Sequence, residues 1–380
     1  MNEPAASVAP GPLPRAEGLL ASFASAGYVP AYPAILQPAE PFLDLSGEDI
    51  RKSLYLTTDA SGDELCLRPD LTIPVARDYL TSGRAGQAAG FCYLGSVFRY
   101  RGGKPSEFLQ AGVESFGRRD FAAADAEMLA LALEATATFK MFDVDVRIGD
   151  VALFAALLDA LKLAPVWRRR LTKDFNRKVS VAQDLERLTL QTKGARPDYQ
   201  GVLSALAGSD RKAALAMVAD LMSIAGATNV GGRSTAEIAD RFLEQSTLAA
   251  SLPNETAGVI ERFLGISGEP DAALATLRTF VAETRIDISR AVDELESRIG
   301  FMAARGLDTK AMRFATAFGR GVDYYTGFEF ELHRKNNGAE PLVAGGRYDG
   351  LMTRLGSPQP IPAVGFSVWI ETLAQAGDAS

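Results

Sequence analysis

The sequence predicts an α+β fold with a largely antiparallel sheet flanked by helices and interrupted by a helical insertion. Strand patterns gather in two parts of the chain, from Leu54 to Ile148 and from Met312 to Val368. The stretch between them, residues 164–300, has few strand patterns and strong helical periodicity. Strands and helices are therefore segregated along the chain, whereas a parallel βαβ sheet requires them to alternate.

Composition fits a globular protein with a large core. The chain has 380 residues, of which 47% are hydrophobic and 23% charged, so its length suggests two or three domains. A net charge of −7 weakens the case for a nucleic-acid partner. We find no signal peptide and no apolar run of about 18 residues, so we expect no contact with a membrane.

The cysteine and histidine content excludes several kinds of site. Cys66 and Cys92 are far apart and lack the spacing of a metal-binding pair, which suits a reducing compartment and predicts a cytoplasmic protein. The single histidine, His333, cannot build a histidine-rich metal centre, and a nucleophilic triad is disfavoured. We therefore expect no metal site. We also expect no cofactor.

Elements near the N-terminus follow from composition and periodicity. Residues 1–14 are rich in Pro, Ala and Gly and are expected to lack fixed structure, and residues 15–26 read as an amphipathic helix. Residues 28–42 contain four prolines and must be extended or looped. Short strands are predicted at residues 54–58 and 65–67, around a glycine-containing turn.

The next segment, residues 67–80, joins a strand end to a helix start. Thr72 is a plausible N-cap, and Pro74 suits a first helical turn. Asp70 therefore lies at the junction. The alternative role for Asp70 is a charge that stabilises the positive end of this helix.

A hairpin is predicted at residues 91–116, with strands at residues 91–100 and 107–116. Arg99, Gln110 and Glu114 interrupt otherwise apolar runs. Such side chains are rarely buried unless they are paired or bind a ligand. A solvated sheet face is the alternative interpretation.

The remainder of the chain completes the two predicted domains. The first comprises residues 15–163 and 311–380, and residues 164–310 form the helical insertion and connecting helices. Further elements are predicted as helices at 122–140, 151–161 and 369–376, and as strands at 144–148, 312–318 and 361–368. Residues 328–333 alternate between apolar and polar in the pattern of a period-two strand, and AGGRYDG is expected to form a glycine turn before a short helix.

Three distant segments carry polar residues in sheet-like or glycine-flanked settings. They are Asp70 with Thr72, then Arg99 with Gln110 and Glu114, then Arg320 with Asp323, Tyr324 and Tyr325. If they converge, they form a pocket suited to a small zwitterion. A guanidinium matches a carboxylate, and carboxylate and amide oxygens match an ammonium group.

Four of the quoted stretches together resemble the catalytic domain of the histidyl-tRNA synthetase family. They are RPDLT, FCYLGSVFRYRGG followed by EFLQAGVESFG, GRGVDYYTGFEFEL, and LVAGGRYDGL followed by PAVGFSV. The resemblance covers most of residues 15–376 and is weaker in the helical middle. It implies an antiparallel sheet flanked by helices, a helical insertion and a self-dimer.

Carried over by position, the resemblance implies a histidine pocket. Its members are Asp70, Thr72, Arg99, Gln110, Glu114, Arg320, Tyr324 and Tyr325. Asp70, Thr72 and Gln110 would hold the α-amino group, Glu114 and Tyr325 would face the imidazole, and the two arginines would face the carboxylate. Asp70 is an aspartate where the synthetases usually have glutamate, so its side chain is one methylene shorter. For Tyr324, the alternative to a role in the pocket is packing in the core.

Three departures from the synthetase pattern affect the ATP side of that site. Arg101 replaces the glutamate that fixes adenine, Trp369 stands where a glycine is expected, and Thr372 stands where a nucleotide-clamping arginine is expected. The chain also stops before an anticodon-binding domain would begin. The resemblance therefore shifts to the family of ATP phosphoribosyltransferase regulatory subunits, which are non-catalytic synthetase paralogues.

That resemblance implies a partner, a ligand and a role. The partner is the short catalytic ATP phosphoribosyltransferase subunit, the ligand is histidine, and the role is feedback control of the first step of histidine biosynthesis. Whether histidine binds in the synthetase-like pocket or at the subunit interface stays open. The alternatives are a truncated synthetase or another histidine-adenylating enzyme, and a degenerate ligand-binding module that serves another partner.

Overall fold

The computed structural model describes residues 14–45, 47–176, 216, 252–322, 324–335 and 340–378. Residues 1–13 of the N-terminal segment predicted to lack structure, about half of the predicted helical insertion, and Asp323 lie outside these residues. The chain divides into two units, one made of Met1–Ala156 with Gly265–Ser380 and the other of Leu157–Leu264. The second unit includes helices α7 (Pro165–Asn176) and α12 (Asn254–Leu264).

The first unit is organised around a mixed sheet, which confirms the predicted α+β class. In the described residues its strands run in the order β1 (Val29–Pro30), β5 (Ala89–Phe98), β6 (Glu107–Phe116), β12 (Ala363–Trp369), β11 (Val343–Arg347), β10 (Phe328–Arg334), β7 (Val144–Asp150), β9 (Arg313–Ala315) and β8 (Ser267–Gly268). Neighbouring strands are antiparallel except β1 with β5 and β7 with β9. The sheet is therefore largely antiparallel, as the segregated strand patterns predict.

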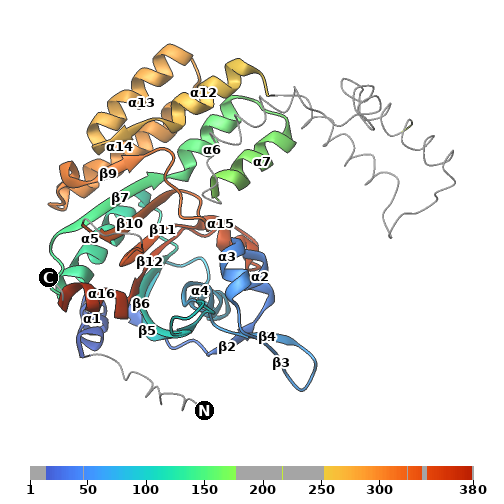
Figure 1. The fold of residues 1–380 in the computed structure, drawn as a ribbon, viewed down its shortest axis with the longest axis vertical. Helices are drawn as coiled ribbons and strands as arrows, with labels where there is room; N and C mark the ends of the chain where they lie inside the picture. Colours follow the sequence, from blue (N-terminus) through green and yellow to red (C-terminus); the bar gives the residue numbers. More distant parts are fainter. Residues whose placement is uncertain are drawn as a thin grey trace. The chain divides into compact units, whose positions relative to one another are not determined.

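Helices cover this sheet, and a small second sheet lies beside it. The helices of the first unit are α1 (Pro14–Ser25), α2 (Glu40–Leu45), α3 (Gly47–Ser53), α4 (Thr72–Thr81), α5 (Phe121–Thr138), α13 (Pro270–Thr284), α14 (Ser289–Ala304), α15 (Asp349–Arg354) and α16 (Ile370–Asp378), and α6 (Val151–Ala160) spans the boundary between the units. Helix α5 packs on β11 and β12 and against α14, which lies beside α13 (Figure 1). Strands β2 (Leu36–Pro38), β4 (Glu64–Leu67) and β3 (Leu56–Thr58) form the small sheet.

Two local predictions are wrong. Helix α4 has Leu71 as its N-cap, so Thr72 is its first residue and not the cap. Gly345 and Gly346 of AGGRYDG lie inside strand β11 instead of forming a turn, whereas Gly350 lies in the predicted short helix, α15. A Cβ atom at Gly345 would lie 2.4 Å from the carbonyl oxygen of Gly365, so the close approach of β12 requires glycine there.

Strand β10 shows the predicted alternation, but both of its faces are buried. Phe328 and Phe330 are fully buried on one face. On the other face, Glu329 and His333 are each 2% exposed and Glu331 is 7% exposed. Because the polar face is not solvated, its charges need partners inside the protein.

Candidate functional site

One cavity in the first unit brings together all eight residues of the predicted pocket. It is lined by Asp70, Thr72, Arg99, Gln110, Glu114, Arg320, Tyr324 and Tyr325, together with Ile50, Val322, Ala344, Tyr348, Gly365, Phe366, Ser367 and Trp369. Its volume is about 60 Å³, which is small for an amino acid. The convergence of segments separated by more than 200 residues is the main structural result for this site.

The central strands position the polar side chains. Strand β6 is paired with β12, so that Gln110 lies opposite Trp369 and Glu114 lies opposite Gly365. A Cβ atom at Gly365 would lie 1.8 Å from Oε2 of Glu114. The glycine therefore provides the space into which the glutamate side chain turns.

Glu114 is a fully buried carboxyl group held by tyrosines. Its Oε1 accepts a hydrogen bond from the hydroxyl of Tyr93 at 3.1 Å, and its Oε2 accepts one from the hydroxyl of Tyr348. Burial raises the pKa of Glu114 to about 8, although these hydrogen bonds act in the opposite direction. At neutral pH this carboxyl group is therefore largely protonated until a partner stabilises its charge.

Asp70 offers a buried acceptor at the start of helix α4. Its Oδ1 accepts a hydrogen bond from the backbone N–H of Ile73 at 3.2 Å. Its Oδ2 is buried and has no partner among the described residues. Burial raises the pKa of Asp70, and the nearby Arg99 opposes this shift. A buried, unpaired carboxylate oxygen is unusual and is complementary to an ammonium group.

Arg99 is the cation with most free hydrogen-bonding capacity in the cavity. Among the described residues, the only hydrogen bond of its side chain is from Nε to the carbonyl of Pro69 at 2.7 Å. Burial lowers the pKa of this guanidinium, and Asp70 opposes the shift. Both terminal nitrogens therefore remain able to bind a ligand carboxylate as a planar fork.

Arg320 is held by acidic groups of β10. Its backbone N–H donates to Glu329 at 2.8 Å, its Nε lies 3.4 Å from Oε1 of Glu331, and its Nη1 donates to the hydroxyl of Tyr325. Burial raises the pKa of Glu329 to about 8, against the attraction of the arginine. The buried polar face of β10 thus compensates the charge of Arg320, and less of that guanidinium is left for a ligand.

His333 continues this chain of contacts away from the cavity. Its Nε2 lies 2.9 Å from Oε2 of Glu331, and its Nδ1 is buried without a partner among the described residues. His333 does not line the cavity. The only histidine of the sequence is thus one step removed from the candidate site.

An amide and a pair of phenols complete the walls. The Oε1 of Gln110 accepts a hydrogen bond from the backbone N–H of Leu71 at 3.0 Å, which fixes the start of α4 against β6. The ring of Tyr324 lies 5.0 Å from that of Tyr325 and 5.8 Å from that of Tyr348. Tyr324 therefore belongs to the aromatic core and also lines the cavity.

Sequence reasoning missed the residues that hold Glu114. The hydroxyl of Tyr93 also lies 3.0 Å from Oγ of Ser367. Strand β5, which carries Tyr93, and strand β12, which carries Ser367, therefore both help to position the carboxyl group of Glu114. A tyrosine inside a buried strand usually needs a polar partner for its hydroxyl. That rule could have marked Tyr93 and Tyr348 as candidates for contact with a buried carboxylate.

The residues that depart from the synthetase pattern have different positions. Trp369 lines the cavity. Arg101 does not line it, and its guanidinium carbon lies 4.6 Å from the centre of the Phe108 ring. Glu371, next to Thr372, accepts the backbone N–H of Leu109 at 2.8 and 3.1 Å.

A metal-binding cluster and a membrane-spanning helix are both absent from the part of the chain that the structure describes. These residues contain no group of three or more His, Cys, Asp or Glu side chains able to hold a metal ion. None of the described helices is both long and apolar enough to cross a bilayer. The cavity offers carboxyl groups, guanidinium groups, an amide and phenols, an arrangement suited to binding a small zwitterion.

Comparison with known proteins supports both the fold and the family. The family described as histidyl-tRNA synthetase matches residues 15–230 and 233–373. Proteins of Brucella canis and Brucella suis, each named ATP phosphoribosyltransferase regulatory subunit, are 39% identical over 349 residues, covering 90% of this chain and 92% of theirs.

Solved structures share the fold at lower identity. A Bacillus halodurans protein titled as an ATP phosphoribosyltransferase regulatory subunit/histidyl-tRNA synthetase has a TM-score of 0.65 at 23% identity, over 97% of this chain and 81% of that one. A histidine–tRNA ligase subunit of Alicyclobacillus acidocaldarius has a TM-score of 0.59 at 22% identity, over 100% and 98%. The chain therefore belongs to the histidyl-tRNA synthetase family and, within it, with the ATP phosphoribosyltransferase regulatory subunits.

Proposed function

We propose that this chain is a cytoplasmic, non-catalytic regulatory subunit of ATP phosphoribosyltransferase that serves the first step of histidine biosynthesis. The similarity to proteins of that name, at 39% identity over 90% of the chain, is the observation that carries this proposal. The partner is a short catalytic ATP phosphoribosyltransferase subunit, and the chain also pairs with itself. Histidine is the regulatory ligand.

The cavity supports histidine as the ligand. Asp70 supplies an unpaired carboxylate oxygen for the α-amino group, with Thr72 and Gln110 beside it. Arg99 supplies two free terminal nitrogens for the carboxylate, and Glu114 supplies a buried carboxyl group for an imidazole nitrogen. The remaining three residues, Arg320, Tyr324 and Tyr325, complete the pocket around the imidazole and the carboxylate.

The small size of the cavity gives this ligand a means of acting on the protein. A volume of about 60 Å³ does not admit a whole amino acid unless lining side chains move apart. The Tyr325–Arg320 and Tyr348–Glu114 hydrogen bonds cross this space and would have to rearrange. A ligand that favours the rearranged form shifts the protein toward it, which is the physical basis for feedback control.

The residues at the positions expected to bind nucleotide support the absence of catalysis. A synthetase-like site must hold ATP beside the amino acid, and here Trp369 occupies the wall where a glycine is expected. Arg101 lies on the Phe108 ring and reverses the charge of the expected glutamate. Each lost charged contact to ATP costs about 1.5–3 kcal/mol, so amino-acid activation falls by orders of magnitude.

The deciding experiment mixes the purified chain with a short catalytic subunit and measures phosphoribosyl transfer with and without histidine. We expect a stable complex, higher activity than that of the catalytic subunit alone, and inhibition when histidine is added. Absence of association and of activation would refute the regulatory role.

A second assay tests the enzymatic alternative. Histidine-dependent exchange of pyrophosphate into ATP reports amino-acid activation without any tRNA. We expect no exchange above background, and exchange at rates usual for synthetases would identify the chain as an adenylating enzyme.

A further inference from the structure

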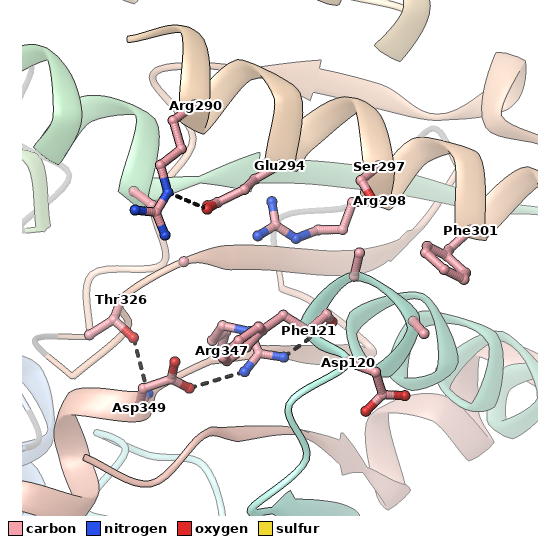
Figure 2. Close-up of a pocket in the computed structure, with 14 residues that line it drawn as sticks. Asp120, Phe121, Arg290, Glu294, Ser297, Arg298, Phe301, Thr326, Arg347 and Asp349 are labelled. Carbon is pink, nitrogen blue, oxygen red and sulfur yellow. Dashed lines mark hydrogen bonds and ion pairs between the residues drawn. The ribbon is translucent and has the colours of Figure 1, made fainter. Parts of the chain in front are cut away.

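A second cavity in the first unit shares no lining residue with the amino-acid site. Its volume is about 510 Å³, within the range of small-molecule sites in proteins. It lies between the start of α5, one side of α14 and the segments around Thr326 and Arg347 (Figure 2). Its walls hold Phe121, Phe301 and three alanines beside a few polar groups, a composition typical of ligand pockets.

Two aromatic rings line this cavity and remain partly accessible. Phe121 is 42% exposed and Phe301 is 44% exposed, although large apolar side chains usually lie in the core. The guanidinium carbon of Arg347 lies 4.8 Å from the centre of the Phe121 ring, so the buried side of that ring is already covered. The accessible sides of the two rings are suitable surfaces for stacking a flat ligand.

Hydrogen-bond donors come from the first turn of α5. The carboxylate of Asp120 makes no cap hydrogen bond, because it is turned to Arg118 with distances of 3.0 and 2.6 Å. The first N–H groups of a helix have no partner within the helix. The backbone N–H groups of Ala122 and Ala123 therefore stay without a described partner, and both residues line the cavity.

A second donor and an acceptor lie on other walls. Arg298 donates from Nε to Asp125 at 2.6 Å and from Nη1 to Asp150, which leaves Nη2 without a partner among the described residues. The Oδ1 atom of Asp349 accepts hydrogen bonds from Nη1 of Arg347 at 3.1 Å and from the backbone N–H of Ala363 at 2.8 Å. Its Oδ2 atom is therefore available as an acceptor. Figure 2 shows two hydrogen bonds at the edge of the cavity, one from Arg347 to the carboxylate of Asp349 and one from the backbone N–H of Asp349 to the hydroxyl of Thr326.

The charges on the walls balance one another. Asp120, Glu294 and Asp349 face three arginines, at positions 290, 298 and 347. Each of these arginines is already paired with a carboxylate. A strongly charged ligand therefore gains little here, whereas a neutral ligand can use the free donors and the free acceptor.

We propose that this cavity binds a neutral, planar heteroaromatic ligand of the nucleobase or nucleoside class. The ring stacks on Phe301, which lines the cavity and is partly accessible. Its ring nitrogens or carbonyl groups accept from the first turn of α5 and from Arg298, and its amino group donates to Asp349. An aromatic hydrocarbon fits the rings but leaves these polar groups unpaired, which disfavours it.

The test measures binding of adenosine and cytidine to the full-length chain by calorimetry and by saturation-transfer NMR. We expect binding of at least one nucleoside, with saturation transferred mainly to protons of the base, and no binding of ribose. Phe301→Ala should weaken binding about tenfold, because base–aromatic stacking is lost. Phe142→Ala is the matched control, since Phe142 is 79% exposed and does not line the cavity.

A second variant tests the acceptor. Asp349→Asn retains an oxygen for the backbone N–H of Ala363 and replaces the free oxygen by a donor. It should weaken binding of adenosine, whose amino group needs an acceptor, while thermal melting shows that the variant folds. Failure of both nucleosides to bind at millimolar concentration overturns the proposal. It is also overturned if the Phe301→Ala protein binds as tightly as the wild type, or if Glu114→Gln, in the other cavity, abolishes binding.

Discussion

Two buried groups of charged side chains in the first unit are arranged in opposite ways. In the first, which we call the ion cluster, Arg298 and Arg347 lie around Asp125 and Asp150. Arg298 and Arg347 each approach Asp125 at 2.6 Å, and Arg298 also pairs with Asp150. In the amino-acid cavity, by contrast, Asp70 has an oxygen without a described partner, and the hydrogen bonds to Glu114 come from hydroxyl groups and not from a cation.

The contrast separates structural charges from charges available to a ligand. A buried ion pair whose hydrogen bonds are satisfied ties elements together, here α5, α14 and the sheet. A buried carboxyl group without a cation carries an unfavourable desolvation energy that only a ligand or a proton removes. The following predictions test this separation, beginning with the largest expected effect.

Removing a cation from the ion cluster should destabilise the fold most. Arg298→Met leaves the buried Asp150 without its cation and leaves Asp125 paired with Arg347 alone, which costs about 3–5 kcal/mol in the free energy of unfolding. Urea denaturation measures this loss. Arg290→Met is the matched control on the same helix, because the side chain of Arg290 is 94% exposed and its pair with Glu294 is worth about 0–1 kcal/mol. Equal losses in both variants would contradict a structural role for the cluster.

In the amino-acid cavity the cost should appear in ligand binding. Arg99→Met removes the guanidinium with two free terminal nitrogens, and the loss of a charged hydrogen bond costs about 1.5–3 kcal/mol, or about 10- to 150-fold in the dissociation constant for histidine. Calorimetry with histidine measures the change. Arg101→Met is the control, since Arg101 does not line the cavity. Unchanged affinity for histidine in Arg99→Met would show that histidine binds outside this cavity.

The protonated state of Glu114 predicts a pH dependence of stability. Its pKa of about 8 in the folded chain exceeds the usual value of 4.5, so the folded protein holds a proton that the unfolded chain has released between those values. Stability therefore falls as the pH rises from about 4.5 to 8, by up to about 1.4 kcal/mol per pH unit for this group. Glu114→Gln should flatten the slope of unfolding free energy against pH. Glu329, whose pKa is also raised to about 8, maintains the remaining slope. A slope that is unchanged in Glu114→Gln would refute the assignment.

The smallest effect is expected at Arg101. Its contact with the Phe108 ring is worth about 0.5–1 kcal/mol at a partly exposed site, so Arg101→Ala should lower the free energy of unfolding by no more than this. Pyrophosphate exchange should stay at background in Arg101→Glu, because Trp369 still lines the cavity. Histidine-dependent exchange in the single variant would show that Arg101 alone suppresses nucleotide binding.

Local patterns determined much of the fold. The strand Glu107–Phe116 has the bounds predicted for it, and α5 and α6 begin and end within two residues of their predictions. Alternating and helical periodicity identify these elements because each has one period and a buried face. The sequence also identified Arg99, Gln110 and Glu114 as candidate site residues, because polar residues inside apolar strands are rare.

The hydrogen-bond partners of those polar residues depend on the tertiary structure. Nothing local indicates that Tyr93 and Tyr348 hold Glu114, or that Gly365 provides its space, since these residues meet across strands far apart in sequence. In β10, period-two alternation indicates which residues share a face but does not indicate what covers that face. Pairing between distant strands determines both, and it therefore separates the compensated charges from those left for a ligand.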